Sequence, residues 1–125
     1  MLASTRYGTR DLARSAAFYD EIAAILGASR LFSFERTIAW RGADGGMFMI
    51  GPPLEGEASV GNGTQIGLIA PNRAAVDAAH ARALELGSCS EGEPGFRGPP
   101  ERELYACYFR DPDGHKIMVY NAKPI

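Results

Sequence analysis

The stretch TQIGLIAPNRAAVDAAHARALELG, residues 64–87, is typical of a β-strand followed directly by an amphipathic helix. Ile66 and Leu68 alternate along its first part, as residues on one face of a half-buried strand do. Asn72 is a favourable N-cap residue, and Gly87 is a natural left-handed terminator. Small and apolar residues recur between them at helical spacing: Val76, Ala79, Ala83 and Leu86.

The same order of elements occurs earlier in the chain. Asp11 stands where an N-cap residue is expected, Gly27 ends the helix, and the interval nearly equals that within residues 72–87. One stripe of this first helix consists of Leu12, Ser15, Ala16, Tyr19, Ile22, Ala23 and Leu26. Short apolar runs separated by turn residues follow each helix, so we predict an α+β fold built of two β-α-β-β-β modules.

Length and composition favour one ordinary globular domain. Hydrophobic residues make up 46% of the chain and charged residues 22%, which are typical values. We expect a single domain over 1–125, with module one at about 1–54, a linker at about 55–62 and module two at about 63–125. A chain of this length needs neither disulfides nor a structural metal to be stable.

Charge and cysteine usage narrow the expected partners. The formal net charge is −2, with both signs interspersed, and no apolar segment approaches membrane-spanning length. We therefore expect no nucleic-acid partner and no membrane partner. Cys89 and Cys107 have no CxxC or Cys/His spacing, which favours two reduced thiols in a cytoplasmic protein.

The segment Asp111-Pro112-Asp113-Gly114 has the composition of a tight turn. Pro112 presets the first turn position and Gly114 accepts a positive φ, which predicts a type I turn with a glycine bulge. A calcium loop is excluded, because the third spaced oxygen ligand and the later glutamate are absent.

Four segments, in order and spacing, carry a resemblance to a known family: GTRDLARSAAFYDEI, MFMIGPP, GNGTQIGLIAPNRAAVDAAHARALELG and YFRDPDGHKIMVY. Together they resemble the vicinal oxygen chelate superfamily of glyoxalases, bleomycin-resistance proteins and extradiol dioxygenases. The resemblance implies two curved, four-stranded mixed sheets that enclose a central cavity, and a homodimer. It also implies that metal-dependent members take His or Glu ligands from the first, fourth, fifth and eighth strands.

In this chain the four ligand positions hold Ser4, Met49, Gln65 and Met118. None of these residue types suits Mg, Mn, Zn, Ni or Fe(II), which bind imidazole or carboxylate ligands. His80 falls in the middle of a helix and His115 at a turn, so neither replaces a ligand. We expect no metal and no other cofactor.

Alternation of side chains along each strand extends these positions to a predicted cavity lining. The loop lengths pair Tyr108–Met118, Ala106–Tyr120 and Phe109–Ile117 in the closing hairpin, and Trp40–Met47 and Ile38–Met49 in the earlier one, across a four-residue GADG loop. The lining predicted in this way is Ser4, Arg6, Trp40, Met47, Met49, Gln65, Ile69, Tyr108, Met118 and Tyr120. Arg6, two residues after Ser4, is expected to point into the cavity and hold an anion, or else to pair with Glu101 or Glu103.

Three functions from different classes fit these observations. The first is a metal-free protein that binds a small apolar or aromatic, anionic organic molecule in the cavity. The second is a glyoxalase-related lyase, isomerase or other enzyme that uses a non-standard or metal-independent site. The third is a dimeric accessory module without a ligand. The segment 91–103, rich in Gly and Pro, reads as a loop that serves either as a lid or as a plain connection.

Overall fold

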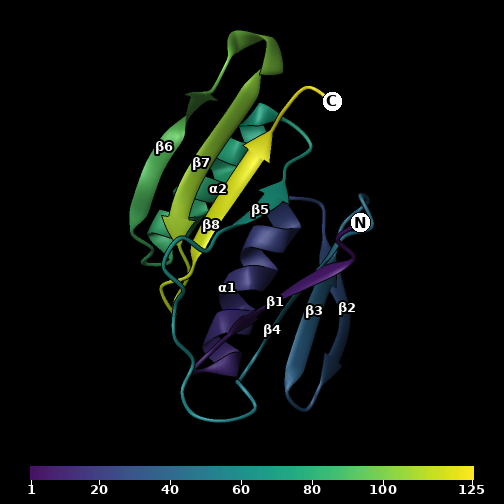
Figure 1. Cartoon of the computed structure of the whole chain (residues 1–125), viewed down its shortest axis with the longest axis vertical. Helices are drawn as coiled ribbons and strands as arrows, with labels where there is room; N and C mark the ends of the chain where they lie inside the picture. The colour runs from purple at the N-terminus through teal and green to yellow at the C-terminus, as the bar shows by residue number, and fades with distance from the viewer.

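The computed structural model describes all residues of the chain, 1–125 (Figure 1). The first half consists of β1 (Ser4–Gly8), α1 (Leu12–Ile25), β2 (Ser29–Phe34), β3 (Thr37–Arg41) and β4 (Met47–Gly51). The second half consists of β5 (Ile66–Ile69), α2 (Arg73–Glu85), β6 (Ser90–Arg97), the 3-10 helix η1 (Pro100–Arg102), β7 (Leu104–Arg110) and β8 (Lys116–Asn121).

The strands form two separate four-stranded sheets with the orders β1-β4-β3-β2 and β5-β8-β7-β6. In each sheet the first strand pairs in parallel with the last, and the other pairs are antiparallel. The two halves share one topology, so the predicted α+β fold with two mixed sheets is confirmed. The sheets do not join into a closed barrel.

Both helices begin and end as their capping residues predict. The side chain of Asp11 accepts a hydrogen bond from the Arg14 amide at 3.0 Å, and Asn72 accepts one from the Ala75 amide at 2.8 Å. Each helix is followed by a glycine in the left-handed region, one of them Gly27 with φ of 75°. Such caps each stabilise a helix by about 1 kcal/mol.

One apolar core runs through both halves of the molecule. Helix α1 packs on the first sheet, α2 packs on the second, and the two helices contact each other. Phe18 of α1 also reaches Phe109 of β7, with ring centroids 6.1 Å apart. Fully buried side chains such as Ile22 and Val76 belong to a single cluster, and each contributes about 1.5–3 kcal/mol through burial.

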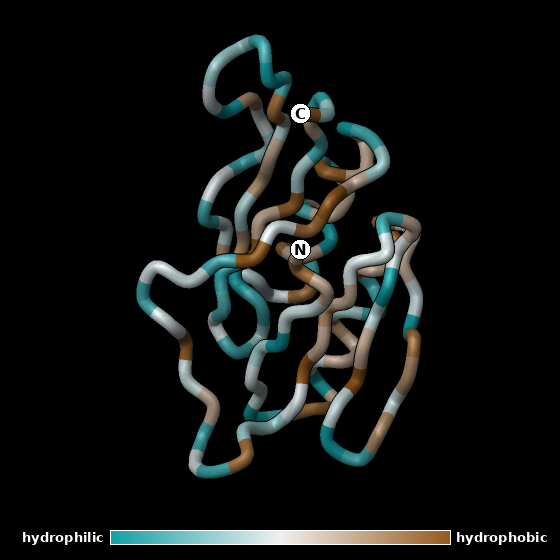
Figure 2. The backbone as a smooth tube through the Cα atoms, turned by 45° about the vertical axis from the view of Figure 1, so that its right-hand side comes forward, coloured by the Kyte–Doolittle hydropathy of each residue, from teal (hydrophilic) through white to brown (hydrophobic).

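The connection between β4 and β5 runs as an extended loop along the outside of the molecule (Figure 2). It covers residues 52–65 and therefore includes the expected linker. Neither helix is long and apolar enough to span a membrane.

The registers of the two hairpins differ in how well the sequence predicted them. In β7–β8 the observed pairs include Tyr108 with Met118, as predicted. In β3–β4 the prediction was wrong by one residue: Trp40 pairs with Phe48, and Met49 pairs with Ala39. The connecting loop has five residues, 42–46, where four were expected, so Trp40 lies on the face opposite to the methionines.

The segment predicted as a loop over 91–103 is mostly a strand. Residues 90–97 form β6 at the edge of the second sheet, with register shifts around Gly92 and Gly95. Proline lacks an amide donor and is tolerated in an edge strand beside a bulge, which explains how Pro94 fits there.

Candidate functional site

A cleft of about 700 Å³ lies between the two halves of the chain. Its floor is the second half of α1, including Tyr19, Ile22 and Ala23. One wall is formed by residues 2–5 and the β3–β4 turn, and the other by β5 with the residues beside it. We call this feature the inter-sheet cleft.

The cleft exists because β1 and β5 do not pair with each other. Each is an edge strand of its own sheet, and both contribute residues to the walls. The first sheet is tied to the second near one end of β1, where the Tyr7 hydroxyl donates to the carbonyl oxygen of Lys116 in β8 at 3.2 Å. The remaining separation between the two edges is open to a molecule from solvent.

The lining of the cleft is mainly apolar, with 15 hydrophobic residues among 24. Polar groups are few and include Ser4, Asp44, Gln65 and Asn121. Asn121 already has a partner within the protein, because its side-chain amide donates to the Ala70 carbonyl oxygen at 3.0 Å. An apolar cavity of this size with a few polar groups is typical of sites for organic molecules.

Four residues predicted for the lining, Ser4, Met47, Gln65 and Ile69, do line the inter-sheet cleft. Trp40 reaches the cleft from the core side and does not share a face with Met47. It is only 3% exposed, stacks on Phe48 at 6.1 Å, and donates its indole N–H to Asp20 at 2.9 Å. It is therefore mainly a core residue.

Three other predicted residues, Tyr108, Met118 and Tyr120, lie on the face of the second sheet that points away from α2. This face adjoins the cleft at Gly67, where an added Cβ would lie 3.1 Å from the Tyr120 ring and 3.9 Å from the Met118 sulfur. Gln65 also reaches across, with its amide 3.7 Å from the Met118 sulfur. The open face of the second sheet thus continues the wall of the cleft.

Arg6 and Met49 are neighbours on the open face of the first sheet, outside the cleft lining. The prediction that Arg6 shares the face opposite to Tyr7 is confirmed, since Tyr7 is buried. Its guanidinium, however, does not point into the cleft. It donates to the carbonyl oxygens of Pro52 at 2.9 Å and Arg36 at 3.4 Å. It pairs with neither of the glutamates considered from the sequence.

Ser4, Met49, Gln65 and Met118, the residues expected at the family's four metal-ligand positions, are not of types that suit a transition metal. Their side chains supply a hydroxyl, an amide and two thioethers, which are poor donors for the divalent ions concerned. No group of three or more His, Cys, Asp or Glu side chains is close enough to hold a metal ion. No chemical step through a metal follows from this donor set.

Cys107 is enclosed in the core and out of reach of solvent. Its side chain is fully buried, and burial raises the pKa of its thiol to about 11. Cys89 is exposed, and both cysteines are free.

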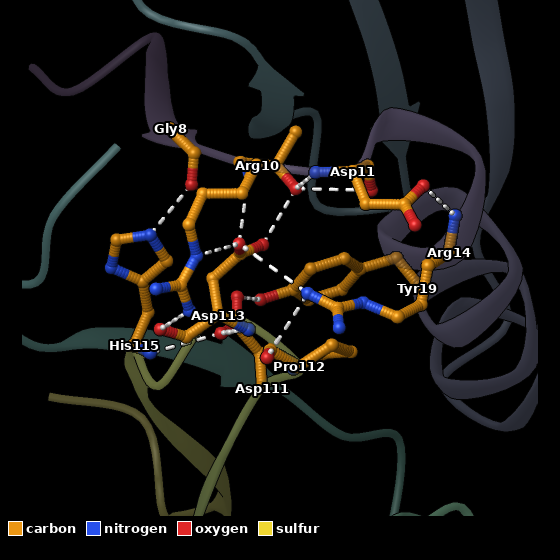
Figure 3. A network of polar contacts seen from close by, with 10 residues as sticks. Gly8, Arg10, Asp11, Arg14, Tyr19, Asp111, Pro112, Asp113 and His115 are labelled. Carbon is orange, nitrogen blue, oxygen red and sulfur yellow. Dashed lines mark hydrogen bonds and ion pairs between the residues drawn. The ribbon is translucent and has the colours of Figure 1, made fainter. Parts of the chain in front are cut away.

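Sequence reasoning missed a buried polar network that joins the two halves (Figure 3). Asp113 of the β7–β8 turn accepts from the Thr9 hydroxyl at 2.6 Å and from the Arg10 amide at 2.9 Å. Asp111 accepts from the Tyr19 hydroxyl at 2.6 Å. The turn was predicted correctly, but nothing in its local pattern showed that its carboxylates bind the first half.

His115 belongs to the same network. Its Nε2 lies 2.7 Å from the Gly8 carbonyl oxygen, and its ring stacks on Tyr7 with centroids 4.1 Å apart. This explains why a histidine at a turn is only 5% exposed. The residue has a buried structural position that the sequence did not predict.

A second, polar pocket of about 300 Å³ was also missed. It lies between residues 61–65, Arg110 and Lys116, and none of the residues that line it is hydrophobic. Gln65 lines both this pocket and the inter-sheet cleft. The alternation that places Tyr108 and Met118 on the open face also places Arg110 and Lys116 there, and that signal was available from the sequence.

Comparisons with known proteins agree with this architecture. The model of the glyoxalase/bleomycin resistance protein/dioxygenase superfamily matches residues 2–119. A glyoxalase/bleomycin resistance protein from Albidiferax ferrireducens T118 is 33% identical, with 99% of each chain covered and a TM-score of 0.88. A comparison with curated proteins gave no match.

More distant solved structures share the fold. A fosfomycin resistance protein from Mesorhizobium loti is 18% identical, with 98% of this chain and 92% of that chain covered and a TM-score of 0.67. A lactoylglutathione lyase from Agrobacterium tumefaciens is 21% identical, with 96% of this chain and 92% of that chain covered and a TM-score of 0.67. From the topology, the match along almost the whole chain and the 33% identical relative, the protein belongs to the glyoxalase/bleomycin resistance protein/dioxygenase superfamily.

Proposed function

We propose that the protein binds a small, largely apolar or aromatic organic molecule in the inter-sheet cleft and holds it without a metal. The observation that carries this proposal is the cleft itself, with a volume of about 700 Å³ and a mainly apolar lining. A buried apolar contact area supplies affinity, while the few polar groups orient the ligand. The thioether of Met47 adds a polarisable surface that adapts to irregular ligand shapes.

Binding is a better match to the lining than catalysis. General acid–base chemistry needs a group such as His, Glu or Asp beside the reacting atoms. Asp44 is the only carboxylate in the lining, and it lies exposed in the β3–β4 turn. Some solved structures with this fold are described as enzymes, including the lyase from Agrobacterium tumefaciens, but that likeness concerns the fold alone.

The cleft proposal is tested with a charge placed on its wall. Ile69, 47% exposed, lines the cleft, whereas Leu84, 41% exposed, lies on α2 outside it. We expect neutral aromatic probes such as 2-naphthol to raise the Tm of the parent protein and of Leu84→Glu in a saturable way. Ile69→Glu should lose this response, because a bound apolar ring would desolvate the new carboxylate.

Loss of the response in both variants, or in neither, would contradict the cleft as the site. Conversion of the probe or of a related carbonyl compound, followed by chromatography, would instead favour an enzyme. Absence of any saturable response would leave an accessory module as the better proposal.

We also propose that the protein forms a homodimer. The open face of the first sheet carries half-buried Met49, and that of the second carries half-buried Tyr108 and Met118, which a partner surface would cover. Closed two-fold dimers are the commonest assembly. Light scattering should give twice the chain mass of 13.4 kDa at micromolar concentration; the mass of one chain would contradict the proposal.

A further inference from the structure

The polar pocket described above contains two cations for one acid. Arg110 and Lys116 are paired across the β7–β8 ladder, and both line the pocket. The Nε of Arg110 lies 2.9 Å from a carboxylate oxygen of Glu91. The Lys116 ammonium forms no salt bridge and lies 5.3 Å from the centre of the Tyr108 ring. One positive charge is therefore left uncompensated beside the pocket.

Glu91 remains ionised near neutral pH and does not remove this excess. The hydrogen bond from Arg110 lowers the pKa of Glu91, and the charge of Lys116 lowers it further. A second donor of Arg110, Nη1, is used by the Gly114 carbonyl oxygen at 3.1 Å. Lys116 is thus the freer of the two cations and the one able to turn toward a ligand.

The rest of the pocket lining is the exposed loop segment 61–65. None of the amide N–H groups of residues 61–65 donates a hydrogen bond within the chain. Gly63 has φ of 84°, a left-handed conformation of the kind that turns successive amides toward one side in anion-binding bends. The Thr64 side chain folds over Gly61 so closely that a Cβ at Gly61 would collide with its hydroxyl oxygen.

The pocket and the inter-sheet cleft adjoin at Gln65, which lines both. A molecule with its apolar body in the cleft can therefore extend a polar end past Gln65 toward Lys116. We propose that this pocket binds the oxyanion group, a carboxylate or a phosphate, of the ligand whose apolar part occupies the cleft. The proposal rests on the proposed cleft function and restricts it to amphipathic organic anions.

This assignment moves the anion-binding role away from Arg6. The Arg6 guanidinium donates to the Pro52 carbonyl oxygen and lies outside both pockets. The charge that remains free beside the cleft is the one on Lys116. Removal of the Lys116 charge should therefore weaken the binding of anionic ligands, whereas removal of the Arg6 charge should not.

The test uses three probes with one ring system: 2-naphthoate, 2-naphthyl phosphate and neutral 2-naphthol. Lys116→Met keeps most of the stem and removes the charge. It should weaken both anions roughly ten- to a hundredfold, the range for a lost charge-assisted hydrogen bond, and leave 2-naphthol unchanged. Lys123→Met, the same substitution outside both pockets, should leave all three affinities unchanged, and so should Arg6→Met.

Equal affinity of the parent protein for naphthoate and naphthol would overturn the proposal. So would a selective loss in Arg6→Met rather than in Lys116→Met. A loss for only one of the two anions would support the site and identify which oxyanion it takes.

Failure of the cleft is distinguishable from failure of the oxyanion pocket. If no naphthyl probe binds, the cleft proposal fails, and inorganic phosphate then decides the pocket alone. Phosphate should shift the amide NMR signals of residues 61–65 in the parent protein and much less in Lys116→Met. Unshifted signals, or equal shifts in both proteins, would overturn the pocket.

Discussion

The two hairpin turns occupy equivalent places in the two halves but have opposite surroundings. The β7–β8 turn, residues 111–115, is largely buried, with Asp111 5% and Asp113 8% exposed. The β3–β4 turn, residues 42–46, is mostly exposed and forms part of the cleft wall. One turn therefore joins the halves, while the other is left free beside the cleft.

The difference follows from the side chains that each turn carries and from what they meet. Asp113 meets the start of α1 and satisfies donors there that would otherwise be buried without a partner. Asp44 is exposed, and its carboxylate lies beside Gly42 and Gly46 of its own turn. We infer that equivalent turns of a repeated fold can differ in role: here one turn binds the two halves together, and the other borders the cleft.

The largest expected effect concerns these two aspartates. Asp113→Ala should lower the free energy of unfolding by about 3 kcal/mol, because the buried Thr9 hydroxyl and Arg10 amide lose their acceptor. The ion pairs of Asp113 with the half-exposed guanidinium groups of Arg10 and Arg14 add little to this value. Asp44→Ala should change it by less than about 0.5 kcal/mol. Urea denaturation measures both, and equal effects would refute the difference between the turns.

Next in size is the hydroxyl that reaches the turn from α1. Tyr19→Phe should cost about 1–2 kcal/mol, because the buried Asp111 carboxylate loses one of its donors and keeps only the backbone amides of Asp113 and His115. The matched variant is Tyr105→Phe. The hydroxyl that it removes donates to Asp77 at 2.7 Å on the surface of the parent protein. This substitution should cost less than about 0.5 kcal/mol. Thermal and urea unfolding of both variants provide the comparison.

The two turns should not differ in the cost of their backbone conformation, so the difference between them should come from their side chains alone. Gly45 has φ of 82° and Gly114 has φ of 96°, both in the region that disfavours residues with a Cβ. Gly45→Ala and Gly114→Ala should each cost about 1 kcal/mol. Values that differ by more than about 1 kcal/mol would show that backbone strain, and not only side-chain partners, separates the two turns.

The smallest effects are expected in the pH dependence of two carboxylates, one from each half. Burial raises the pKa of Asp111, so the folded state binds this proton more tightly than the unfolded state does. Its contribution to stability therefore increases as the pH falls through the raised pKa. The hydrogen bond from Arg30 lowers the pKa of Asp20, so its contribution is present at neutral pH and disappears as the pH falls through the lowered pKa.

The opposite pH dependences of the two contributions are tested with Asp111→Asn and Asp20→Asn. The free energy of unfolding of each variant is measured in urea from pH 7 to about pH 3. Relative to the parent protein, Asp111→Asn should become less stable toward acid. The deficit of Asp20→Asn should shrink over the same range. Curves that move in the same direction would contradict the assignment of buried and exposed carboxylates.

The strand registers show where sequence reasoning succeeded and where it failed. Pro112 and Gly114 define one turn geometry, so the pairing of Tyr108 with Met118 could be predicted. The segment GADGG contains glycines that allow a four- or a five-residue loop, and the wrong choice put Trp40 on the wrong face. A single residue of loop length thus decided whether the only tryptophan belongs to the site or to the core.

By itself, the sequence determined the local elements of this protein: the two capped helices, the repeated order of strands and the family to which the chain belongs. These depend on periodicity, capping and turn residues within short segments. Only the tertiary structure decided that β1 and β5 leave a cleft between them, that Asp111 and Asp113 bind the other half, and that Lys116 is left without an acid. Each of these depends on contacts between residues up to about a hundred positions apart, and no local pattern encodes such contacts.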